Sequence, residues 1–113
     1  MRIAFVMDPI DRVDIKADTT FAIMFAAQER GHDVYYVRMQ DMSARGDEAW
    51  SVVQRVTLRR EEGNHVDIDE PEHEHLGDFD CVFMRKDPPF DVPYLHAAHL
   101  LELAEAKGTF VVN

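Results

Sequence analysis

Cysteine and long hydrophobic runs are nearly absent from this sequence. A single cysteine, Cys81, cannot form an internal disulfide, so the sequence gives no sign of an oxidising compartment. The first apolar stretch contains five residues and ends at Asp8, far short of the hydrophobic region of a signal peptide or of a membrane span. We therefore expect a cytoplasmic protein with no membrane partner.

Basic residues are also scarce. The chain has 12 Lys and Arg against 22 Asp and Glu, a formal net charge of -10. A field of this sign repels the phosphates of nucleic acids and anionic lipid surfaces, so neither is an expected partner. A small anionic ligand stays compatible with the sequence, because a nearby basic group outweighs a distant, screened charge.

The few glycines are isolated, at positions 31, 46, 63, 77 and 108. Neither the GxGxxG fingerprint nor the GxxxxGK[ST] phosphate loop occurs, so we expect no self-sufficient nucleotide site and no cofactor in this chain. The 113 residues are 46% hydrophobic and 30% charged, which is typical of one globular domain covering residues 1–113.

Apolar β-branched runs alternate with helical patterns along the chain. Strands are predicted at Ile3–Met7, Asp33–Arg38, Cys81–Arg85 and Phe110–Val112. Helices are predicted from an N-cap at Asp18 or Thr19 to about Arg30, and over Val92–Lys107. The first helix is apolar nearly all round. Either it is covered by the sheet on one side and by something else on the other, or it is a helix of small residues within a single core. Strand, helix and strand in succession predict a right-handed crossover and a parallel sheet.

The middle of the chain carries a different pattern. Apolar and polar residues alternate between Met42 and Arg60 around a possible turn at Gly46-Asp47, which predicts a β-hairpin. Glu61–Asp80 is expected to be mainly surface loop, apart from a short strand at Val66–Ile68. The predicted fold class is α/β, with an open, mainly parallel doubly wound sheet and an inserted hairpin. The last predicted strand has an apolar composition typical of a buried strand, and the sequence ends immediately after it. We therefore expect the domain to be part of a longer protein.

Two loops carry the candidate site residues. Ligands of open parallel sheets bind beyond the carboxyl ends of the strands, where Asp8-Pro9 and the segment Arg85 to Asp91 are expected. Arg85 could bind a carboxylate through paired donors, Lys86 would act as a point charge, and Asp8 could accept hydrogen bonds from a ligand ammonium group. Alternatively, Asp87 caps the following turn and Arg85 pairs with an acid; the residues alone leave both open.

Three other groups of residues have a possible chemical role. The stretch from His65 to His75 offers His, Asp and Glu side chains that could bind a divalent metal, although a solvated surface loop is the simpler interpretation. His96 and His99, with Glu102, are expected on an exposed helix face. Cys81, inside a strand, is expected to be a buried small apolar residue rather than a nucleophile.

Four motifs in this order resemble the amino-terminal domain of prokaryotic glutathione synthetases. They are Met7-Asp8-Pro9-Ile10, Ile15-Lys16-x-Asp18-Thr19-x-Phe21-Ala22, Met84-Arg85-Lys86-Asp87-Pro88-Pro89-Phe90-Asp91, and Glu105-x-Lys107-Gly108-Thr109 with Val112-Asn113. The string RKDPPFD is the most specific of them. The resemblance is weakest from Ser43 to Asp78.

The resemblance implies part of an ATP-grasp ligase that joins glycine to γ-glutamylcysteine through an acyl phosphate, with ATP and Mg²⁺ supplied by a C-terminal ATP-grasp domain. This chain would form part of the peptide-substrate cleft, bind γ-glutamylcysteine or glutathione, contribute to homo-oligomer contacts, and be inactive alone, with no catalytic or metal-binding residue. The cleft residues implied are Asp8, Pro9, Arg85, Lys86, Asp87, Pro88, Pro89 and Phe90. The alternative is a free-standing α/β module that binds a small anion or a partner protein without catalysis.

Overall fold

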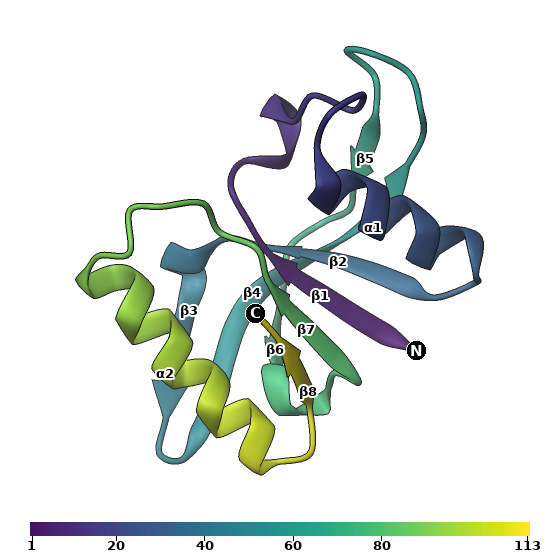
Figure 1. The fold of residues 1–113 in the computed structure, drawn as a ribbon. Coiled ribbons are helices and arrows are strands. Elements are labelled where there is room, and N and C mark those ends of the chain that lie inside the picture. The colour runs from purple at the N-terminus through teal and green to yellow at the C-terminus, as the bar shows by residue number, and fades with distance from the viewer.

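Strand β1 (Arg2–Val6) lies at the centre of a curled, mixed sheet. It pairs in parallel with β2 (Asp33–Val37) on one edge and with β7 (Cys81–Met84) on the other, and β8 (Phe110–Val112) continues the parallel part beyond β7. Figure 1 shows this computed structural model, which describes residues 1–113. The residues from Ile3 to Met7 are all buried, as expected for a parallel strand covered on both faces.

The two helices lie on opposite faces of this sheet. Helix α1 (Thr19–Glu29) joins β1 to β2 and packs Phe21 and Met24 against one face. Helix α2 (Val92–Ala106) joins β7 to β8 and packs on the other face. Each helix begins where an aspartate accepts a backbone hydrogen bond: Asp18 from Phe21 N at 2.8 Å, and Asp91 from Tyr94 N at 3.1 Å. The predicted doubly wound fold is therefore confirmed. Neither helix is long and apolar enough to span a membrane.

The predicted hairpin is also confirmed. β3 (Met42–Arg45) and β4 (Glu48–Leu58) pair antiparallel around Gly46, whose φ of 60° favours glycine. β4 is antiparallel to β2, and its outer edge also holds β5 (Val66–Ile68) and β6 (Glu72–His75). Three short 3₁₀ turns complete the chain: η1 (Ile10–Arg12), η2 (Met39–Asp41) and η3 (Leu76–Asp78).

The short strand predicted at Val66–Ile68 is confirmed as β5, but the prediction of loop for the rest of Glu61–Asp80 missed β6 and η3. The sequence of β6, EHEH, has no apolar alternation. Its strand is stabilised by cross-strand partners: the rings of His73 and His75 stack on Trp50 with centroids 5.3 and 5.5 Å away, and Glu74 forms an ion pair with Arg2. These partners lie far away in the sequence.

The structure also decides two points about burial. Helix α1 is covered by the sheet on one side only: Phe21 and Met24 are buried, whereas Ala22 and Ala26 are exposed. The expectation that the last strand is buried is wrong for its first residue, since Phe110 is 69% exposed. β8 is an edge strand, and only the face toward α2 is covered.

Candidate functional site

The carboxyl ends of β1 and β7 lie side by side at one edge of the sheet (Figure 1). The connection from β1 leads to β2 on one side, and the connection from β7 leads to β8 on the other, so the winding direction reverses between these two strands. Such switch points open a crevice beyond the strand ends. The loop after Met7 and the loop after Met84 both begin there.

Asp8 connects the two loops directly. Its Oδ2 accepts a hydrogen bond from the backbone N–H of Asp87 at 2.9 Å, and its Oδ1 lies 2.9 Å from the Lys86 ammonium. Burial alone would raise the pKa of Asp8, but the Asp87 N–H and Lys86 together outweigh it and lower that pKa below its ordinary value. The two loops therefore meet at one edge of the sheet, as their sequences predict.

Arg85 points its guanidinium group toward the start of α1. Its Nε donates a hydrogen bond to Thr20 Oγ1 at 3.1 Å, and Arg85 makes no ion pair with any acid. A hollow of about 30 Å³, roughly the space of one water molecule, lies here and is lined by Met7, Asp8, Val13, Asp18, Thr20, Arg85 and Asp87. The half-buried guanidinium thus retains donors that could bind an anion.

The alternative interpretation of this loop is wrong on both counts. The Asp87 carboxylate accepts no hydrogen bond from the turn that follows it, and Asp91 caps the next helix. Arg85 donates to a hydroxyl group rather than to a carboxylate. Asp87 is exposed and is held through its backbone N–H.

The other predicted site residues lie outside this hollow. Pro9, Pro88, Pro89 and Phe90 are exposed and do not line the hollow, and the ring of Phe90 packs edge-on against Tyr94 at 4.8 Å. The hollow instead includes Val13 and Thr20, which are not among the residues predicted from the sequence. Their only signal in the sequence is their place between the end of the first strand and the first turn of the first helix, the position where switch-point ligands bind.

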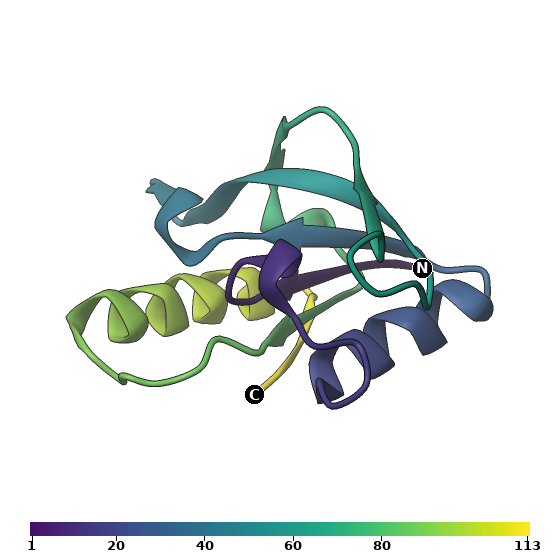
Figure 2. The ribbon, with the colours of Figure 1, turned by 90° about the horizontal axis from the view of Figure 1, so that it is seen from above.

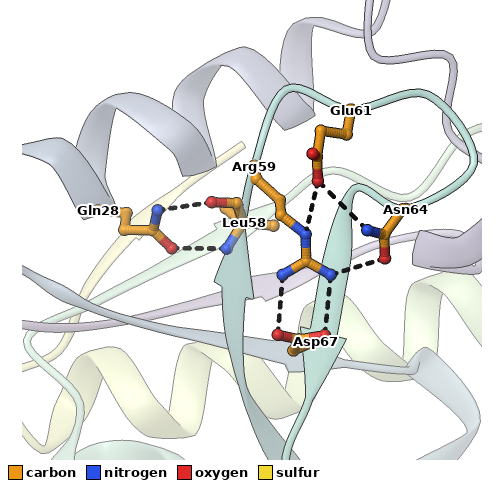
Figure 3. Close-up of polar contacts among 6 residues, drawn as sticks. All are labelled: Gln28, Leu58, Arg59, Glu61, Asn64 and Asp67. Atoms are coloured by element: carbon orange, nitrogen blue, oxygen red, sulfur yellow. Dashed lines mark hydrogen bonds and ion pairs between the residues drawn. The ribbon is translucent and has the colours of Figure 1, made fainter.

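The hairpin formed by β4 and β5 is held by the polar contacts drawn in Figure 3. The Arg59 guanidinium binds both carboxylate oxygens of Asp67 at 2.8 and 2.9 Å, and it also contacts Asn64 and Glu61. On the helix side, the Gln28 amide pairs with both backbone groups of Leu58, at 2.8 and 2.7 Å. The β4–β5 connection is therefore fixed to α1 at one end and stiffened along its length.

His65 links this hairpin to the loop after Asp8. It is buried, and its Nε2 donates to the Ile10 carbonyl at 2.7 Å while its ring meets Phe21 edge-on at 5.9 Å. The turn at Ile10, two residues after Asp8, is thus held from the hairpin side.

The metal-site interpretation of the His65–His75 stretch is not supported. Asp67 binds Arg59, Glu74 binds Arg2, and no group of three or more potential ligands is gathered at one point. His96 and His99 lie on the exposed side of α2, as predicted. Cys81 is only partly buried, not fully buried as expected. Its partial burial and the nearby Asp80 raise the pKa of its thiol, which agrees with its interpretation as a non-nucleophilic strand residue.

Comparisons with known proteins cover the whole chain. Residues 1–113 match the family described as "Prokaryotic glutathione synthetase, N-terminal domain". Over 113 residues the chain is 44% identical to a glutathione synthetase of Bradyrhizobium diazoefficiens, 40% identical to one of Rhodopseudomonas palustris, and 39% identical to one of Yersinia pestis. These matches take in 100% of this chain but only 36%, 36% and 35% of the three relatives. The chain therefore spans little more than a third of their length.

Proposed function

The chain belongs to the family of prokaryotic glutathione synthetase N-terminal domains, and we propose that it forms the substrate-side domain of an ATP-dependent ligase that joins γ-glutamylcysteine and glycine. The main support within the structure is the pair of contacts that Asp8 makes with the Asp87 N–H and with Lys86. These contacts fix two loops at the switch point, and the Arg85 guanidinium faces the hollow between them. A fixed cation at such a crevice is suited to holding a carboxylate of a peptide.

The residues divide this task between binding and positioning. Arg85 would bind a substrate carboxylate, because its outer nitrogens have no acid partner in the chain. Asp8 would act as a positioning residue, since both of its oxygens already bind Asp87 and Lys86. Pro9 and the segment from Pro88 to Phe90 would form the outer wall, with little conformational freedom to lose on binding.

The residues of this chain do not fit ATP and Mg²⁺. There is no glycine-rich phosphate loop, and no cluster of carboxylates or histidines could hold the metal ion. In the proposed function, ATP and Mg²⁺ bind in the part of the ligase that corresponds to the remaining length of the relatives. Because phosphoryl transfer depends on that metal and its surrounding cations, the chain alone is expected to make no glutathione.

Two measurements test the proposal. The chain alone, incubated with γ-glutamylcysteine, glycine, ATP and Mg²⁺, should release no ADP above background, and glutathione formation would contradict its role as a substrate-side domain. A chimera in which residues 1–113 replace the aligned part of the Bradyrhizobium diazoefficiens enzyme should be an active ligase. An inactive but folded chimera would contradict the proposal.

The chimera also tests Arg85. Loss of one charged hydrogen-bonding partner costs about 1.5–3 kcal/mol, so Arg85→Ala should raise the KM for γ-glutamylcysteine by about tenfold or more and change the KM for ATP much less. Arg60→Ala is a matched control, because Arg60 is exposed and stacks on Phe25, away from the hollow. Equal effects of Arg85→Ala on both KM values would indicate a folding role instead.

A further inference from the structure

The sheet face that carries α1 is only half covered. Cys81 and Phe83 of β7 point to this face, and their register partners Phe110 and Val112 of β8 point the same way. Helix α1 lies over β2 and β4, at the other end of the sheet (Figure 1). Phe110 is consequently 69% exposed, and Cys81, Phe83 and Val112 are only partly buried.

A hollow of about 300 Å³ lies between α1 and this open part of the sheet. Ile23, Ala26 and Ala27 line it from the helix, and Ile3 and Phe83 line it from the strands. We call this surface the β7–β8 face. It consists of Cys81, Phe83 and Phe110 on the strands and of Ile23, Ala26 and Ala27 on the neighbouring side of α1. The small alanine side chains allow another backbone to approach α1 closely.

The shape of the β7–β8 face suits one helix. Parallel sheets of this class are covered by helices on both faces, and α2 already covers the other side of β7 and β8. Two strands about 4.8 Å apart, paired over three residues, give a strip roughly 10 Å wide and 10 Å long, the diameter of one helix. A stable dimer buries about 800 Å² on each partner, so this strip alone is too small to hold a second copy of the chain.

The charges at one end of the hollow indicate a direction. Arg30 lines the hollow and forms no ion pair, and beside it the Met1 ammonium donates to His32 Nδ1 at 3.0 Å. These cations lie at the amino ends of the strands, opposite the candidate site. A helix that runs back from the carboxyl edge would place its C-terminus there, where it carries a partial negative charge of about half a unit.

We propose that the β7–β8 face binds an amphipathic helix from the polypeptide that follows this domain in a ligase of the relatives' length. The relatives extend well beyond the 36% that this chain covers, so such a segment is available in them. Its apolar side contacts Phe83 and Phe110, and its C-terminal end meets Arg30. This inference rests on the proposed function, because it takes the chain to be the first part of a longer ligase.

The single thiol of Cys81 lies on the β7–β8 face and reports its coverage. The probe is a synthetic peptide of about 25 residues, long enough for a linker and a helix of average length, taken from the Bradyrhizobium diazoefficiens relative directly after its aligned part. At saturation it should slow modification of Cys81 by a disulfide reagent at least about fivefold, because the thiol becomes inaccessible. Phe110→Asp should abolish this protection, and Arg30→Glu should weaken it.

Phe90→Asp is the matched control, since Phe90 is 67% exposed but packs against Tyr94 of α2, the helix on the opposite face of the sheet. The peptide should protect Cys81 in this variant as in the parent chain. Absence of protection, or protection that persists in Phe110→Asp, would overturn the inference. Without peptide, Cys81 could instead become more protected as the protein concentration rises, with dimers detected by sedimentation equilibrium. That result would show that a second copy covers the face, and it would also overturn the inference. An active chimera without peptide protection would reject this inference alone, whereas an inactive chimera would reject the proposed function.

Discussion

At the scale of single residues, Asp8 illustrates how one carboxylate can order two loops that are 79 positions apart in the chain. One oxygen accepts a backbone N–H and the other faces an ammonium group. The backbone bond needs only an acceptor, while the contact with Lys86 needs a negative charge. Substitution by asparagine separates these two contributions.

Asp8→Asn should destabilise the chain at neutral pH and have no effect in acid. The pKa of Asp8 is lowered in the folded chain, so the ionised carboxylate stabilises the fold above its unfolded pKa, and this stabilisation is lost as the pH falls through the folded pKa. Because the Asp8 side chain is 37% exposed, we expect a loss of only about 0.5–1 kcal/mol at pH 7 that shrinks below about pH 4. Urea unfolding across this range measures it. Asp11→Asn, at an exposed residue without an ion pair, is the control, and a difference independent of pH would contradict the role of the charge.

At the scale of elements, the β4–β5 hairpin supports the loop that carries Asp8. Arg59 stiffens the hairpin by binding Asp67 (Figure 3), and this contact lowers the pKa of Asp67. Two side chains of the hairpin contact the loop after Asp8: His65 donates to the Ile10 carbonyl, and Glu62 forms an ion pair with Lys16 at 3.2 Å. Because the ion pair is exposed and contributes little, the buried bond from His65 is the main link. The position of that loop should therefore depend on this bond.

His65→Phe should keep the packing against Phe21 but leave the Ile10 carbonyl without its partner. An unpaired buried carbonyl costs about 1–3 kcal/mol, which urea unfolding should detect. Amide hydrogen exchange in residues 10–18 should accelerate more than exchange in β1, because the loop is released locally. His96→Phe, on the exposed side of α2, should change neither quantity. Unchanged exchange in the loop of His65→Phe would refute the supporting role of the hairpin.

The elements also indicate which features of this fold are encoded locally. The parallel strands and both helices could be predicted, because apolar runs and the capping residues Asp18 and Gly31 are signals within a few positions. Strand β6 could not, since its pairing depends on Trp50 and Arg2, far away in the chain. The meeting of Asp8 with Lys86 followed from the switch-point rule, whereas the contribution of Thr20 depends on how α1 is placed over the strand ends.

At the scale of the whole molecule, the surplus of negative charge should oppose folding. Acidic residues exceed basic ones by ten (22 against 12), so the compact chain repels itself. Raising NaCl from about 20 to about 200 mM shortens the Debye length from about 20 Å to below 10 Å. Screening also weakens the surface ion pairs, but these contribute little individually.

We therefore expect the urea midpoint at pH 7 to rise over this salt range. The rise should be smaller near pH 4, where many carboxylates are protonated and the net charge is reduced. A fall of the midpoint at pH 7 would show that attraction between surface charges exceeds the overall repulsion.

The central place of β1 has a consequence for synthesis on the ribosome. This strand is made first, and one of its edges is paired once Asp33–Val37 has been made, but its other edge waits for Cys81–Met84. At about 5 to 20 residues per second, that edge stays open for several seconds. An apolar strand with a free edge is a template for pairing between nascent chains. The protein is thus most prone to aggregate while it is still being translated, before its own later strand can close the sheet.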